Sequence, residues 1–130
     1  MGGEPERVAA NAGRARERSA AHCLDERLRE RRRHEARHAL ALTRLGRPSE
    51  AGPLVHRALA LLDRQRHLEG SVEEVLVQCA TVLRATGASE HAAVVRARAR
   101  ASAIAKHAGL VDPAWRAAFA ALPWNAELLS

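Results

Sequence analysis

Apolar residues recur at three- and four-residue steps through most of the chain, and proline and glycine separate the segments that carry this pattern. Such steps match the turn of an α-helix that has one buried face. The few β-branched clusters lie inside segments rich in Ala, Leu, Glu and Arg, so no sheet is predicted. The expected fold is all-α, with helices over residues 5–21, 24–45, 48–66, 71–86 and 89–107 and a short one over 113–122.

The ends of these predicted helices carry residues that are typical of caps. Gly46 and Gly87 each follow a helical segment and are expected to adopt the left-handed conformation that ends a helix. Ser71, with a glutamate three residues later, predicts a capping box, and Ser89 opens the next helix. Asp112, followed by proline, predicts the cap and first turn of the short last helix.

A repeat becomes visible when the two central pairs of predicted helices are compared at a fixed offset. Ala39 and Ala80, for example, are 41 residues apart, and five positions recur in phase at this offset. Each helix pair of such a repeat exposes an apolar face that a neighbouring pair covers, and small residues mark the closest helix crossings. The five matches are Ala39 and Ala80, Leu42 and Leu83, Gly46 and Gly87, Ala51 and Ala92, and Ala58 and Ala99.

Small and large residues alternate in a characteristic block around the first turn glycine: Ala39, Leu42, Leu45, Gly46, Ala51 and Ala58. This block resembles the tetratricopeptide repeat. The resemblance implies one domain, a right-handed α-solenoid of stacked helix hairpins, with a half repeat (4–21), a first repeat (24–66), a second repeat (71–107) and a capping helix (112–122). It also implies a concave face, built by residues 24–45 and 71–86, that binds a peptide or helix of a partner protein.

The tail carries a second pattern, made by Asp112, Pro113, Arg116, Phe119, Pro123, Asn125, Leu128 and Leu129. It is similar to the last tetratricopeptide-like repeats of large bacterial ATPase regulators, which include LuxR-type transcription activators and kinase-linked ATPases. The resemblance implies a C-terminal sensor or scaffold part of a signalling or transcription regulator, or a fragment of one. No GxxxxGK[ST] phosphate loop occurs in the sequence, so no ATP-dependent function is implied.

Charge, cysteine content and hydropathy narrow the functional classes. The chain has 21 Lys+Arg against 15 Asp+Glu, a formal net charge of +6 that favours nucleic acid or an acidic partner. Cys23 and Cys79 lack CxxC spacing and are expected to be buried, reduced thiols. The sequence has neither a secretory signal nor an apolar run of bilayer length, so we expect a cytoplasmic protein without membrane contact.

One segment, His34-Glu35-Ala36-Arg37-His38, matches the HExxH motif, which places two zinc ligands and a glutamate base on one helix. No third ligand stands at a suitable spacing. The alternative interpretation is that His38 packs within the repeat while His34 and Glu35 face solvent. We expect no cofactor, no metal and no enzymatic activity, and a zinc hydrolase with His34 and His38 as ligands remains the alternative.

Arginines crowd residues 27–37, on a helix predicted to form the concave face. We expect residues 29–37 and the exposed parts of residues 73–78 to contact a protein or peptide partner, including an acidic one. Interleaved glutamates also fit a solvated helix face, and the arginines also fit the phosphates of a nucleic acid. The candidate partner-binding residues are Arg29, Arg31, Arg32, Arg33, Arg37, Glu73 and Gln78.

Two further surfaces carry predictions. Trp115 and Phe119 lie four residues apart on one helical face, which is typical of a helix that closes the end of a repeat stack, and a partner-binding hot spot is the alternative. Val8, Ala12 and Ala15 lie in phase on the first helix, and their exposure would favour self-association.

Overall fold

The computed structural model describes residues 4–64 and 72–130, with the side chains of the first helix from residue 13 onward. Within these ranges the chain is all-α, as predicted, and contains no strand. None of the described helices is both long and apolar enough to cross a membrane. The helices are α1 (Glu4–Arg44), α2 (Pro48–Arg64), α3 (Val72–Ala85), α4 (Ser89–Gly109), α5 (Pro113–Ala121) and α6 (Pro123–Leu129).

The first two predicted helices form one continuous helix, α1, so the predicted break between residues 21 and 24 is wrong. Neither glycine nor proline lies between Ala21 and Leu24, and good helix formers surround this point. His22 Nε2 lies 3.0 Å from Oε1 of Glu26, which joins successive turns across the predicted break. Residues 4–21 are therefore not a separate helix.

The remaining predicted helix ends agree closely with the structure wherever the structure describes them. Arg66 and the predicted cap Ser71 lie outside the described residues. Ser89 is the first residue of α4, and no side chain caps this helix. Asp112 caps α5 as predicted, because its Oδ1 accepts hydrogen bonds from the backbone N–H groups of residues 114 and 115 at 2.8 and 3.3 Å.

Two turns of the same geometry follow α1 and α3. Gly46 and Gly87 have φ angles of 76° and 87°, in the left-handed region that favours glycine. In both turns the glycine N–H donates to the carbonyl three residues back at 3.1 Å, and the next N–H donates to the carbonyl five residues back at 2.8 or 2.9 Å. These bonds satisfy carbonyl groups at the helix end. The predicted glycine caps are confirmed.

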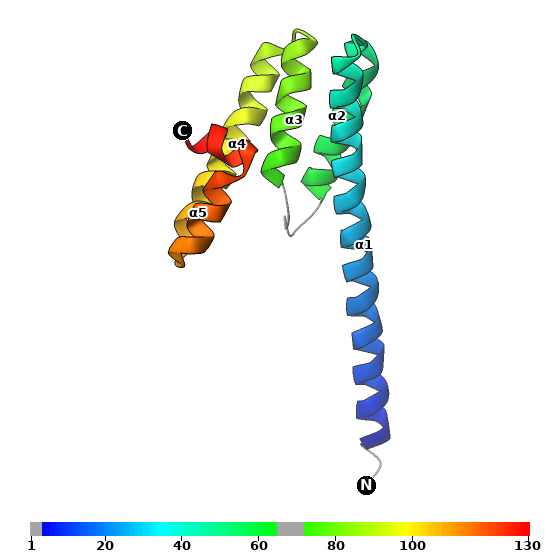
Figure 1. Cartoon of the computed structure of the whole chain (residues 1–130). Coiled ribbons are helices and arrows are strands. Elements are labelled where there is room, and N and C mark those ends of the chain that lie inside the picture. Colours follow the sequence, from blue (N-terminus) through cyan, green and yellow to red (C-terminus); the bar gives the residue numbers. More distant parts are fainter. Residues whose placement is uncertain (1–3, 65–71) are drawn as a thin grey trace.

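The core lies between two helix pairs, α1 with α2 and α3 with α4, and α3 also contacts both α1 and α2 (Figure 1). The alanines of the 41-residue pattern are all buried, as predicted. Larger side chains such as Val55, Leu62 and Leu76 fill the space between these alanines. The exposed fraction is at most 4% for each of Ala39, Ala51, Ala58, Ala80, Ala92 and Ala99.

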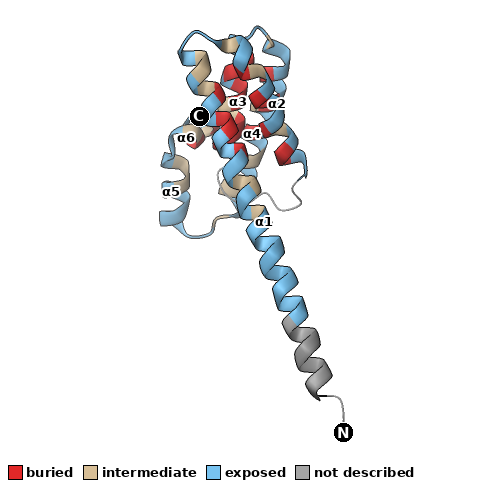
Figure 2. Cartoon of the chain, turned by 90° about the vertical axis from the view of Figure 1, so that its right-hand side faces the viewer, coloured by how far each residue is buried: buried red, intermediate tan, exposed pale blue. Residues whose placement is uncertain are grey.

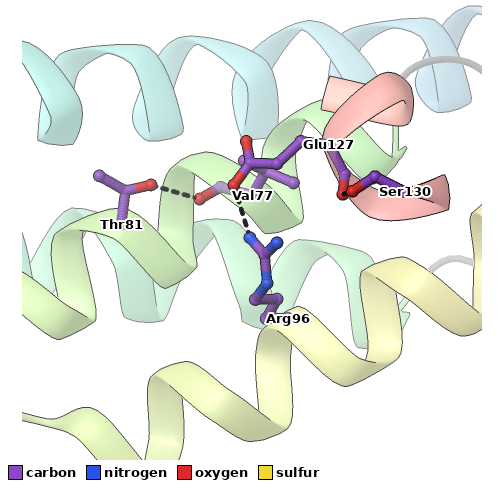
Figure 3. Close-up of polar contacts among 5 residues, drawn as sticks. All are labelled: Val77, Thr81, Arg96, Glu127 and Ser130. Carbon is purple, nitrogen blue, oxygen red and sulfur yellow. Dashed lines mark hydrogen bonds and ion pairs between the residues drawn. The ribbon is translucent and has the colours of Figure 1, made fainter. Parts of the chain in front are cut away.

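The C-terminal end of the core is closed by α6, which contacts both α3 and α4. Leu128 of α6 is 2% exposed, and Arg96 of α4 forms an ion pair with Glu127 at 2.8 Å (Figure 3). The expected capping helix, α5, has no buried residue, and Trp115 on it is 68% exposed. The prediction that these aromatics close the stack is therefore wrong for Trp115, whereas Phe119 is half-buried with its ring centroid 6.4 Å from that of His107 on α4. Pro123 begins another helix, α6, that covers this end of the core.

The N-terminal half of α1 extends away from the other helices (Figure 2). Every side chain described between residues 13 and 24 is exposed, Ala15 and Cys23 included, whereas the side chains of Val8 and Ala12 lie outside the described residues. The expectation of two buried thiols is therefore confirmed for Cys79 and wrong for Cys23. Burial raises the pKa of the Cys79 thiol to about 12, because a thiolate is disfavoured away from water.

We expect Gly46→Ala and Gly52→Ala to change stability in opposite directions. Gly46 has a positive φ, so a Cβ there should cost about 1–2 kcal/mol of unfolding free energy. Gly52 lies inside α2, and no atom from elsewhere in the fold lies within 4 Å of an added Cβ. Alanine should therefore add about 0.5 kcal/mol, the low end of the usual gain because the ring of Pro53 follows directly. Urea unfolding followed by circular dichroism measures both changes, and equal signs would contradict the two backbone assignments.

The two thiols should differ in reactivity. The native chain is expected to react with one equivalent of a thiol reagent, at exposed Cys23, and with two once it is denatured, because the reagent cannot reach Cys79 and that residue stays protonated. Mass spectrometry of the labelled protein counts the modified sites. Rapid labelling of Cys79 in the native Cys23→Ser variant would show that the α3 packing is incorrect.

Candidate functional site

A shallow, open hollow lies between side chains along one side of α1 and is lined by basic residues. Arginines supply four of its six lining residues and glutamate only one, so the hollow carries an excess of positive charge. We call these six residues the arginine surface. They are Arg27, Glu30, Arg31, Arg33, His34 and Arg37.

The phase of α1 decides which arginines belong to this surface. Arg32 is only 2% exposed, because it lies one helical turn before the buried Glu35 and Ala36, on the face that packs against the core. Desolvation by this burial, and then the nearby charge of Arg29, lowers the pKa of Arg32 from its usual value. Arg29 is half-buried. The prediction of partner contact is therefore wrong for Arg32, whereas Arg31, Arg33 and Arg37 are exposed as that prediction requires.

The predicted contact residues on α3 do not join the arginine surface. Glu73 is 2% exposed, and its Oε1 accepts a hydrogen bond from Ser102 Oγ at 2.7 Å and lies 2.8 Å from Lys106 Nζ. The expectation that Glu73 is accessible to a partner is therefore wrong, and this carboxylate links α3 to α4 instead. Gln78 is half-buried and is not a lining residue of the hollow.

One acidic side chain of α3 does reach the arginine surface. Glu74 Oε1 lies 3.4 Å from Nη2 of Arg37, and the carboxylate is largely buried. Its position in the first turn of α3 also suits the positive end of the helix dipole. Within the described residues, Arg27, Arg31 and Arg33 form no ion pair of this kind. The positive charge of the surface is therefore concentrated toward the N-terminal side of Arg37.

The HExxH residues do not form a shared site. His34 and His38 are both exposed, with ring centroids 6.1 Å apart, whereas Glu35 between them is 8% exposed and points toward the core. The expectation that His38 is packed and Glu35 solvated is thus reversed. Burial of the Glu35 carboxylate on the core side of α1 therefore keeps it away from the two solvent-exposed imidazoles. In the described part of the chain, no three His, Cys, Asp or Glu side chains come together as metal ligands.

The predicted partner-binding residues did not include three residues that line this surface: Arg27, which lies outside the predicted region, and Glu30 and His34, which lie within it. A signal for two of them was present, because Arg27 and His34 stand four residues before and three residues after Arg31. This spacing places all three side chains on one helical face.

Comparison with known proteins assigns no family to the chain. No protein-family model matches it, and no curated protein or solved structure matches it either. The tetratricopeptide resemblance therefore rests on the residues that carry it.

We expect Glu73→Ala to lower the unfolding free energy by about 2 kcal/mol, because it leaves Lys106 and Ser102 without their buried partner. The control Glu127→Ala removes the exposed partner of Arg96 and should cost about 0.5 kcal/mol or less. Urea unfolding of both variants gives the comparison. Equal losses would contradict a structural role for the buried carboxylate of Glu73.

Proposed function

We propose that this chain is a helical-repeat module of the tetratricopeptide kind that binds an acidic segment of another protein and performs no catalytic step. Two helix pairs with the same glycine turn, and with alanines buried at the same repeat positions, support the stacked-hairpin architecture. The resemblance of the tail to bacterial regulators leads us to propose a role in signalling or transcription control.

The arginine surface is the observation that carries the binding proposal. Its arginines outnumber its one carboxylate, and Glu74 is the only described carboxylate from another helix that pairs with any of them. Guanidinium groups bind carboxylates through charge-assisted hydrogen bonds, which are stronger than those between neutral groups. An acidic protein segment is the ligand that best matches this charge.

A nucleic acid is the second candidate, because the same arginines could contact phosphates. The lining residues include no Phe, Tyr or Trp on which a base would stack. A zinc hydrolase receives no support from the geometry, since the burial of Glu35 separates the proposed base from the two histidines.

Charge reversal of the arginine surface provides the test. The triple variant Arg27→Glu, Arg31→Glu, Arg33→Glu should weaken the binding of a labelled glutamate-glycine peptide by about tenfold or more, because it replaces attraction with repulsion. Fluorescence anisotropy measures the affinity, and circular dichroism checks that the fold is retained.

The matched control is Arg57→Glu, Arg100→Glu, Arg116→Glu, which changes the net charge equally at exposed sites on α2, α4 and α5. It should retain most of the peptide affinity. If both triple variants lose affinity to the same extent, the binding depends on net charge and not on the arginine surface. Tighter binding of a single-stranded DNA of equal charge, with a steep loss in salt, would favour the nucleic-acid candidate.

A further inference from the structure

A row of exposed residues runs along α1 at alternating three- and four-residue steps. We call this row the outer seam. All of its side chains are exposed, so they face away from α2 and α3. Leu45 follows the last residue of α1, and its N–H still donates to the carbonyl of Ala41 at 3.0 Å, which keeps it on the helical path. The outer seam consists of Leu24, Arg27, Arg31, His34, His38 and Leu45, with Ala41 between the last two.

The chemistry of the outer seam changes along its length. Leu24 and Leu45 at its two ends are 56% and 72% exposed and are among the large apolar side chains that solvent reaches most easily. Arginines and histidines occupy the centre, and no seam position carries a carboxylate. The pattern is therefore apolar at both ends and basic between them, with the arginines nearer to Leu24 and the histidines nearer to Leu45.

We propose that the outer seam docks an amphipathic helix of a partner protein, with glutamates or aspartates at the centre of its contact face and apolar residues at both ends. The proposal deepens the proposed function and rests on it. Alternating steps of three and four residues are the spacing by which one helix packs along another, as in a coiled coil. The acidic centre is required by charge complementarity with Arg27 and Arg31.

The length of the outer seam also favours a helical partner. From Leu24 to Leu45 it spans 21 residues of sequence, or roughly 32 Å along the axis at 1.5 Å per residue, which is three heptads. An extended strand advances about 3.3 Å per residue and presents side chains alternately to opposite sides. Its acidic side chains would therefore not repeat with the period of the outer seam.

A second copy of this chain is a poor occupant of the outer seam. Parallel pairing of two seams would place Arg27 and Arg31 of one copy against the same arginines of the other, and like charges at such an interface are repulsive. Antiparallel pairing would place these arginines against Ala41 and His38, which offer them no carboxylate. The same argument applies to a neighbouring repeat whose contact face is only apolar, because it would leave Arg27 and Arg31 without acidic partners.

The test uses three synthetic peptides of about three heptads each. The seam peptide is an alanine-based helix with leucines at the ends and glutamates at the centre of one face. The second peptide has the same composition with its glutamates moved to the opposite face. The third keeps the seam order but carries two central prolines that prevent a helix. We expect the seam peptide to bind the full chain about tenfold or more tightly than either control, measured by calorimetry.

Variants of the chain separate the parts of the contact. Arg27→Glu combined with Arg31→Glu should abolish the preference for the seam peptide, and Leu24→Ser combined with Leu45→Ser should weaken its binding by about tenfold. The two leucines are exposed, so the serine variant should keep the fold, and urea unfolding checks this.

The outcomes test two claims separately: that the partner is acidic, and that it binds the outer seam as a helix. Equal binding of the proline peptide and the seam peptide would overturn the helical mode and leave the acidic-partner function intact. Failure of all three peptides, and of the glutamate-glycine peptide, would overturn both. Tighter binding of a single-stranded DNA of equal charge would also overturn both, in favour of a nucleic-acid partner.

Discussion

Close approach of helices at small side chains is the constraint on which the described core depends. Helix axes come closest where small side chains lie at the crossing, and buried alanines recur at the same positions of both helix pairs. The left-handed glycine at each turn complements this packing, because it reverses the chain within a few residues and satisfies the last carbonyls of the helix. Longer side chains at the crossings would push the pairs apart and open the space that Val55 and Leu76 now fill.

A core rich in alanine buries little apolar area per residue, so polar contacts between the helices matter more than they would in a leucine-rich core. The carboxylate of Glu73 accepts a hydrogen bond from Ser102 and forms an ion pair with Lys106, both on α4. The neighbouring Glu74 forms an ion pair with Arg37 on α1. The first turn of α3 is thus linked to the helix on either side of it. These contacts form in only one orientation of the three helices about their axes. A shift of one residue would bury the carboxylates without their partners.

Much of the fold could be predicted from the sequence, and the errors have identifiable causes. Glycine caps and alanine crossings are local or periodic signals, and they were correct. The predicted break after Ala21 was wrong because no residue between Ala21 and Leu24 ends a helix. The closing role of α6 was not predicted, because its seven residues are too few to show a helical period. Pro123 is its one local signal, since proline suits the first turn of a helix.

The candidate site shows a different limit. An arginine-rich stretch is obvious in the sequence, but the burial of Arg32 follows from the phase of the helix, which the buried Ala36 and Ala39 determine. The burial of Glu73 depends on Lys106, which lies 33 residues further along the chain, and no local signal indicates this contact.

The length of α1 has a consequence for how the molecule moves in water. Its 41 residues span about 60 Å. This length is about four times the radius of gyration of a compact chain of the same size, which is about 14 Å. Friction depends strongly on the longest dimension of a particle. The chain should therefore diffuse and tumble as slowly as a considerably heavier spherical protein, and a monomer would resemble a dimer to any method that judges mass from hydrodynamic size alone.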